Sequence, residues 1–214
     1  MLYHLLYPLS AVFPAFNLFR YVTVRGVWAA LTAFVLSLLL GKTVIRARGR
    51  LKGGQALRAD GPQSHLSKAG TPTMGGILIA LTFTVSVLLW ARWDNRYVWL
   101  ALAGFLWFGL VGFLDDYQKL VLKHSKGISA RFKILLQVLG ACSLMAAYYW
   151  IEPSVGHLAI LNLPFVKTPV PLNHALYFAF AVFVMTGSSN GVPLPAGLDG
   201  LAIGPAAFVA LAFV

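Results

Sequence analysis

Two adjacent aspartates, Asp115 and Asp116, stand at the end of a long apolar run and are well suited to chemistry. A helix C-terminus disfavours negative charge and neighbouring carboxylates repel each other, so the pair needs a compensating cation. Lys119 can supply it from four residues further on. A divalent metal can also do so, and Mg²⁺ typically takes one or two carboxylates plus phosphate oxygens. Two interpretations stay open: a solvated helix end with an ion pair, or a metal–phosphate site.

A third carboxylate, Asp199, lies in Gly-Leu-Asp-Gly at the start of another apolar run. By itself it is typical of a helix N-cap, but on the same side of a membrane as the aspartate pair it favours the metal interpretation. Basic residues accompany these acids, among them Lys68, Lys119 and Lys133. Carboxylates that hold a metal and lysines that hold phosphate oxygens suit a diphosphate substrate. Ordinary loop charge is the alternative, and His65 could be structural or contact a ligand.

Long apolar runs must position these residues. Of 214 residues, 59% are hydrophobic and 11% charged, which is too little charge for the surface of a soluble domain. Five runs meet or approach the length of about 20 residues that crosses a bilayer, and a sixth reaches the end of the chain. They cover residues 22–40, 77–91, 98–114, 134–151, 175–185 and 201–214. We predict an all-α, polytopic transmembrane helical bundle, one domain over residues 1–214, with about five complete spans and the start of a sixth.

The net charge of +11 is distributed as in a membrane protein and not as in a nucleic-acid-binding protein. Twelve of the 17 lysines and arginines fall in two stretches, 42–68 and 119–133. The positive-inside rule places these stretches in the cytoplasm and the N-terminus outside. The first twenty residues are interpreted as an interfacial segment, and the outside loop 152–173 is expected to hold a short strand or a re-entrant piece around 157–165.

Several strings resemble the phospho-N-acetylmuramoyl-pentapeptide transferases of bacterial peptidoglycan synthesis, a family of polyprenyl-phosphate sugar-phosphate transferases. They are Asp60-Gly-Pro-Gln-Ser-His-Leu-Ser-Lys68, Gly70-Thr-Pro-Thr-Met-Gly-Gly76, Gly112-Phe-Leu-Asp-Asp-Tyr-Gln-Lys119, Ser188-Ser-Asn190 and Gly197-Leu-Asp-Gly-Leu-Ala202. The strings follow the family order from about residue 16 to the last residue. The sequence is most similar to the proteobacterial type.

The resemblance implies a Mg²⁺-dependent enzyme of the bacterial cytoplasmic (inner) membrane with its active site facing the cytoplasm. Its substrates would be UDP-MurNAc-pentapeptide and undecaprenyl phosphate, and its products lipid I and UMP, for the cell wall that cell division requires. The implied catalytic residues are Asp115, which would deprotonate the lipid phosphate, and Asp116 and Asp199, which would hold the metal. Lys68 and Asn190 match family positions associated with nucleotide or phosphate binding, and Lys119 completes the acidic motif. From the residues themselves, we add His65 and Lys133 to the expected substrate-binding residues. Membrane lipid is the expected surrounding, nucleic acid is not expected as a partner, and a homodimer stays open.

Two departures from the family pattern bear on activity. Pro193, Pro195 and Ala196 stand where the family has Asn, Thr and an acidic residue, so the site loses a carboxylate and its loop is stiffer. The chain also stops inside the sixth run, and we interpret it as truncated before the later helices of the family. The alternatives are a related transferase for another UDP-sugar and an inactive membrane scaffold; a transporter, with charges in mid-span, is less well supported.

Overall fold

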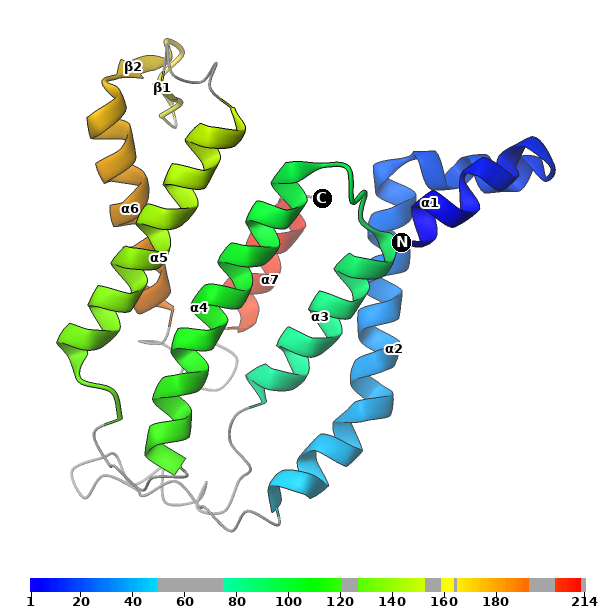
Figure 1. Cartoon of the computed structure of the whole chain (residues 1–214), viewed down its shortest axis with the longest axis horizontal. Helices are drawn as coiled ribbons and strands as arrows, with labels where there is room; N and C mark the ends of the chain where they lie inside the picture. Colours follow the sequence, from blue (N-terminus) through cyan, green and yellow to red (C-terminus); the bar gives the residue numbers. More distant parts are fainter. Residues whose placement is uncertain (50–74, 121–126, 153–158, 164, 193–202, 213–214) are drawn as a thin grey trace. The chain divides into compact units, whose positions relative to one another are not determined.

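The computed structural model describes residues 1–49, 75–120, 127–152, 159–163, 165–192 and 203–212, which are mostly helical (Figure 1). Each of the six apolar runs forms a helix, which confirms the helical prediction. The helices are α2 (Val22–Gly49), α3 (Gly76–Trp90), α4 (Arg96–Leu120), α5 (Ala130–Ile151), α6 (His174–Gly191) and α7 (Ile203–Ala212). Apolar segments in a membrane form helices because a helix pairs its backbone N–H and C=O groups within its own segment, where no water is present to do so.

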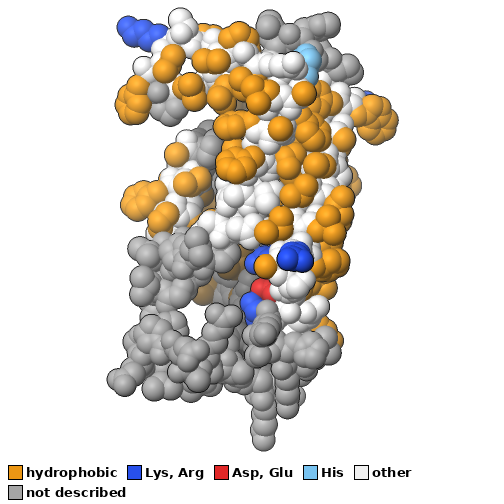
Figure 2. Space-filling model, turned by 90° about the vertical axis from the view of Figure 1, so that its left-hand side faces the viewer, with side chains coloured by type: hydrophobic (Ala, Val, Ile, Leu, Met, Phe, Trp, Pro, Cys, Tyr) orange, Lys and Arg blue, Asp and Glu red, His pale blue; other side chains and the backbone are white. Residues whose placement is uncertain are grey.

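Three of the described helices are long and apolar enough to cross a membrane: Val22–Val44, Arg96–Lys119 and Ala130–Ile151. Helices α3 and α7 are also apolar but shorter. Large hydrophobic side chains are exposed on these and other helices, for example Leu39 of α2 at 68% and Phe183 of α6 at 73%. Figure 2 shows one face of the molecule, where hydrophobic side chains cover most of the described surface. Such a surface fits a membrane protein, because lipid can cover what water cannot.

The described residues group into two compact units. The first comprises Met1–Leu102 and Gly109–Ser129, and the second comprises Ala103–Phe108 and Ala130–Val214. Because α4 passes from one unit to the other and back, its middle turns belong to the second unit. The prediction of a single domain stays a prediction.

In the first unit, α2 and α3 lie side by side. The buried face of α3 carries Thr82, Ser86 and Trp90, which recur every four residues as one helix face requires. The Trp90 indole N–H donates to Thr32 Oγ1 on α2 at 2.9 Å. The Trp90 ring also stacks on Trp28, with 5.8 Å between ring centroids. A hydrogen-bonded tryptophan therefore joins the two helices near one end.

The N-terminal segment packs at that same end of the first unit. It contains α1 (Leu2–Leu6) and two short 3-10 helices, Pro8–Ala11 and Pro14–Arg20. The Tyr3 ring lies under the guanidinium groups of Arg25 and Arg92, at 4.7 and 5.3 Å from the ring centroid. Arg92 also pairs with Asp94, and this hydrogen bond holds the pKa of the Asp94 carboxyl below its usual range. Aromatic and ionic contacts thus dock the first residues on α2 and the α3–α4 turn.

In the second unit, α5 packs against α6. The chain that connects α5 to α6 contains a two-stranded antiparallel sheet, β1 (Ala159–Leu161) and β2 (Val170–Leu172), with Ile160 opposite Pro171. The strand expected around 157–165 is therefore confirmed, and its partner strand β2 was not foreseen. The buried residues of α5 are Gln137, Gly140, Ala141 and Met145.

Gly140 lets the middle of α4 approach α5 closely. The Trp107 indole N–H donates to the Leu136 carbonyl oxygen at 3.0 Å, and a Cβ added at Gly140 would overlap the Trp107 ring. Gly104 is a second close approach, where a Cβ would lie 3.2 Å from Leu144. Small residues at helix contacts are typical of membrane proteins, where close packing replaces the hydrophobic effect.

We therefore expect Gly140→Ala to lower the free energy of unfolding by about 1–3 kcal/mol, because Trp107 must move and lose its hydrogen bond. Thermal unfolding in detergent, followed by circular dichroism, measures this. Gly109→Ala on α4 is the matched control, since a Cβ there meets nothing within 4 Å. Equal stability of the two variants would contradict the close contact at Gly140.

Candidate functional site

Asp115 is buried at the end of α4, with 9% of its surface exposed. Its Oδ2 accepts a hydrogen bond from Lys119 Nζ at 2.7 Å, one helical turn further on. Its Oδ1 accepts from the backbone N–H of Ile128 at 3.1 Å, just before α5 begins. The ion pair foreseen from the four-residue spacing is therefore confirmed. In addition, this carboxylate ties the end of α4 to the segment that leads into α5.

Gly127 makes the second of these contacts possible. It has a φ of +62°, a left-handed conformation that glycine adopts at little cost. A Cβ at this position would lie 2.5 Å from Asp115 Oδ1 and 2.6 Å from Lys119 Cε. The chain must therefore turn here on a residue without a side chain, so that the Ile128 N–H can reach the carboxylate.

Asp116 is exposed, although it directly follows the buried Asp115. Successive residues of a helix are about 100° apart, so burying one aspartate turns the next one away from the packed face. An exposed carboxylate at a helix end suits a hard cation such as Mg²⁺, which needs only one or two carboxylates beside phosphate oxygens and water. Of the two aspartates, Asp116 is therefore the one whose exposed carboxylate can reach a metal ion.

The remaining predicted acidic and basic residues divide between the described and the other parts of the chain. Lys119 and Lys133 are described, the former 42% exposed at its side chain and the latter half-buried near the start of α5. His65, Lys68 and Asp199 lie outside the described residues, as do Pro193, Pro195 and Ala196. Within the described ranges, no three His, Cys, Asp or Glu side chains are grouped as a metal site.

Asn190, predicted to bind substrate, belongs to a polar cluster between α5 and α6. Its Nδ2 donates to Gln137 Oε1 at 2.7 Å and to the Thr186 carbonyl oxygen at 2.9 Å. Gln137 Nε2 donates to Ser189 Oγ at 2.9 Å and to Asn190 Oδ1 at 3.3 Å. Gln137 itself is completely buried. We did not foresee its role, although an amide inside the apolar run 134–151 was the available signal.

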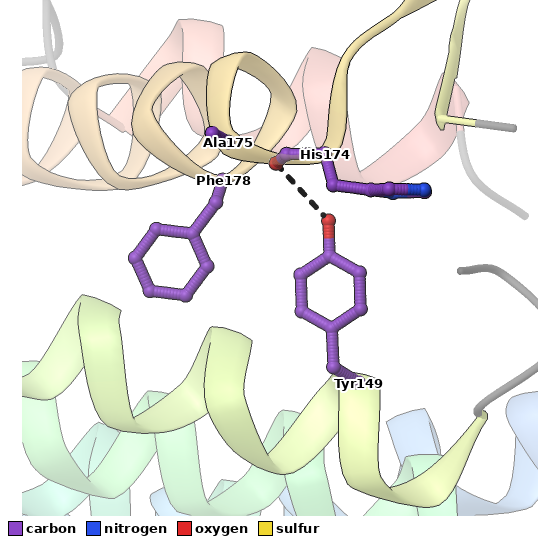
Figure 3. Close-up of a pocket in the computed structure, with 4 residues that line it drawn as sticks. All are labelled: Tyr149, His174, Ala175 and Phe178. Carbon is purple, nitrogen blue, oxygen red and sulfur yellow. Dashed lines mark hydrogen bonds between the residues drawn. The ribbon is translucent and has the colours of Figure 1, made fainter. Parts of the chain in front are cut away.

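A pocket lies at the opposite end of α5 from Lys133. It is lined by Tyr149 of α5 and by His174, Ala175 and Phe178 of α6 (Figure 3). The Tyr149 hydroxyl donates to the His174 carbonyl oxygen at 3.4 Å, and the Tyr149 and Phe178 rings stack with centroids 6.3 Å apart. Its lining is largely apolar and aromatic, as at a membrane interface.

The two aspartates should differ in their effect on stability. We expect Asp115→Ala to lower the free energy of unfolding by about 1–3 kcal/mol, because the Ile128 N–H loses its acceptor. Asp116→Ala, at an exposed position, should change it by no more than about 0.5 kcal/mol. Thermal unfolding in detergent compares the two. Gly127→Ala should destabilise to a similar extent as Asp115→Ala; if Asp116→Ala proves the more harmful aspartate variant, the anchoring role of Asp115 is wrong.

Comparison with known proteins relates this chain to two described groups. Residues 97–214 match the model of glycosyl transferase family 4. Residues 68–79 match signature 1 of the phospho-N-acetylmuramoyl-pentapeptide-transferases. The larger match begins at the start of α4, so it includes Asp115, Asp116, Lys119, Lys133 and Asn190, and the signature begins at Lys68.

Curated relatives carry the name phospho-N-acetylmuramoyl-pentapeptide-transferase. The protein of Desulfotalea psychrophila is 50% identical over 205 residues, 96% of this chain and 56% of the relative. Those of Desulfatibacillum aliphaticivorans and Oleidesulfovibrio alaskensis are 49% and 46% identical over 213 residues, each over 58% of the relative. The chain thus spans a little over half the length of these relatives. Since the family model covers more than half of it, the chain belongs to glycosyl transferase family 4.

Proposed function

We propose that this chain is the N-terminal part of a transferase that makes lipid I. The enzyme would move phospho-MurNAc-pentapeptide from UDP-MurNAc-pentapeptide to undecaprenyl phosphate and release UMP. The observation that carries the proposal is the aspartate pair at the end of α4, with Asp115 anchored and Asp116 exposed. The similarity to the named transferases, near 50% identity, supports the substrate assignment.

The proposed reaction is a phosphoryl-type transfer between two anions. An oxygen of the lipid phosphate forms a bond to the sugar-bearing phosphorus of the UDP-sugar. The bond from that phosphorus to the bridging oxygen breaks, and the bridging oxygen leaves with UMP. The proton of the lipid phosphate goes to a carboxylate of the protein or to water. No protein nucleophile is required, because the lipid phosphate already carries the attacking oxygen.

The two aspartates have different parts in this proposal. Asp116 would meet the phosphate oxygens of the substrates through the metal ion that it holds, because it is exposed beside the end of the apolar helix, where a lipid phosphate would arrive. The resemblance to the transferase family implies Asp115 as the base, and that assignment stays a prediction. Both of its oxygens already accept hydrogen bonds, so we propose that it chiefly orients Lys119 and the segment before α5. In this proposal the partly exposed Lys119 amine binds a phosphate oxygen of the substrate.

Mg²⁺ fits this donor set, since Asp116 offers an exposed carboxylate and the substrates supply phosphate oxygens. Asp116, together with Asp199, would hold the ion, which would neutralise charge on the phosphate oxygens when bound. Lys68, Lys133, Asn190 and His65 complete the proposed substrate contacts.

The proposed topology follows from the charges and the family. The N-terminus lies outside, the chain contributes about five complete spans and the start of a sixth, and the site faces the cytoplasm of a bacterial inner membrane. The three long apolar helices support membrane insertion. In this orientation the end of α4 that carries Asp115 and Asp116 lies on the cytoplasmic side, where the UDP-linked substrate is found. A homodimer remains open.

UMP release from UDP-MurNAc-pentapeptide in the presence of a polyprenyl phosphate tests this function. It is measured on the 214-residue chain and on a chimaera that carries Ala196→Asp and continues with the C-terminal part of the Desulfotalea psychrophila relative. We expect Mg²⁺-dependent release by the chimaera and its loss on chelation with EDTA. A silent chimaera that is folded refutes the proposal. A chimaera that prefers another UDP-sugar would instead support a related transferase.

Within the active chimaera, Asp116→Asn should reduce the rate by at least about 100-fold, since it removes a carboxylate that contacts the substrates. Asp94→Asn is the control, because Asp94 pairs with Arg92 at the other end of the first unit. Unchanged activity of Asp116→Asn would remove Asp116 from the site.

A further inference from the structure

Gln137 is an energetically costly residue at its position. It lies in the second turn of the apolar helix α5 and is completely buried. A polar group inside a membrane helix is expensive unless it is hydrogen-bonded, and such residues commonly serve function. Its partners are Ser189 and Asn190 at the last turn of α6, which adjoin the predicted substrate loop.

The Thr186 carbonyl oxygen determines how the side-chain amides of Asn190 and Gln137 are oriented. The Thr186 carbonyl oxygen can only accept, so the amide of Asn190 must turn its Nδ2 toward it. The same Nδ2 donates its second hydrogen to Gln137, which therefore presents Oε1 to Asn190. Gln137 must then present Nε2, a donor, to the Ser189 hydroxyl. Each amide orientation follows from the preceding bond.

These amide orientations determine the direction of the Ser189 hydroxyl hydrogen. Its oxygen accepts a hydrogen bond from Gln137, so its own hydrogen has to point away from Gln137. Ser189 is half-buried and not fully enclosed, so a ligand can reach that hydrogen. The two hydrogens of the Asn190 amide, in contrast, are both used within the chain. The cluster therefore offers a serine donor and not an asparagine donor.

Lys133 indicates the charge of the ligand. It lies one turn before Gln137 on the same face of α5, because the two are four residues apart. The C-terminus of α6 carries about half a negative charge, which opposes an anion, whereas Lys133 carries a full positive charge. The Ser189 hydroxyl of α6 and the Lys133 amine of α5 are both donors of the kind that suits an oxygen of a phosphate.

We propose that Gln137 is a positioning residue that directs the Ser189 hydroxyl toward a phosphate oxygen of the nucleotide-linked substrate. This inference rests on the proposed function for the identity of the ligand. It changes the role of Asn190, which transmits orientation from the Thr186 carbonyl group and donates no hydrogen of its own to the substrate.

Two substitutions test the donor directly in the chimaera described above. Ser189→Ala removes the hydroxyl, and we expect the Kd for UDP-MurNAc-pentapeptide, from calorimetry, to rise about tenfold. Ser143→Ala on α5 is the control, because the Ser143 hydroxyl donates only to carbonyl oxygens of its own helix, those of Leu139 and Gly140. If Ser189→Ala binds as tightly as Ser143→Ala, the inference is overturned.

Gln137→Glu tests the positioning role through pH. A protonated glutamate can donate to Ser189 as glutamine does, whereas an ionised one only accepts and draws the Ser189 hydrogen toward itself. Binding by this variant should therefore weaken as the pH rises from about 6 to about 9, while the wild type stays nearly constant. On α5 the charged described side chains on the N-terminal side of Gln137 are Arg131 and Lys133, and on α6 the ionisable His174 lies at the other end. A pH-independent Kd for Gln137→Glu contradicts the proposal.

A last measurement separates this inference from the proposed function. Hydrogen exchange of the Asn190 side-chain amide, followed by NMR, should be at least about tenfold slower than that of the exposed Asn173. Equal exchange rates overturn the orientation of the cluster, whatever the protein binds. Slow exchange in the folded, unsubstituted chimaera, together with failure of that chimaera to bind UDP-MurNAc-pentapeptide, supports the cluster and refutes the proposed substrate.

Discussion

The hydrogen bonds of the Asp115 carboxylate are the interaction on which the candidate site depends. One oxygen holds Lys119 on α4, and the other holds the Ile128 N–H thirteen residues away. This requires Asp115 to face the packed side of the helix, and helix geometry then turns Asp116 outward. Two carboxylates that look alike in the sequence are thereby given different environments. The chemical asymmetry of the pair is a result of packing.

A second constraint acts on α5, where polar and small residues replace hydrophobic ones at the contacts with other helices. Gly140 admits Trp107, and Gln137 joins the Ser189 and Asn190 side chains. Lipid tails are as apolar as leucine side chains, so apolar contact by itself does not favour one helix pair over another. Close approach and hydrogen bonds therefore determine which helices pack together. In the second unit, Gln137 thus both pairs α5 with α6 and determines the orientation of the Ser189 hydroxyl, the proposed phosphate donor.

Much of the fold follows from hydropathy, because helices satisfy the backbone hydrogen bonds of six long apolar segments. The ends of the helices do not follow: α2 continues to Gly49 through charged residues, since hydrogen bonding along the helix does not stop where hydrophobicity does. The pair of Asp115 with Lys119 was predictable from its spacing, whereas the bond to Ile128 depends on a left-handed turn at Gly127. The contact of Gln137 with Asn190 joins residues 53 apart, which no local pattern specifies. The positions of His65, Lys68 and Asp199 lie outside the described residues and stay predictions.

The division of roles between Asp115 and Asp116 can be measured with Mn²⁺, which takes oxygen ligands as Mg²⁺ does and is visible by electron paramagnetic resonance. The experiment compares Mn²⁺ affinity in the chimaera with bound UDP-MurNAc-pentapeptide for Asp115→Asn and Asp116→Asn. An asparagine at position 115 still offers an oxygen to the Ile128 N–H, so that variant keeps its anchor and should retain Mn²⁺ binding. Asp116→Asn should lose most of it. Retained binding in Asp116→Asn together with loss in a stably folded Asp115→Asn would contradict the account.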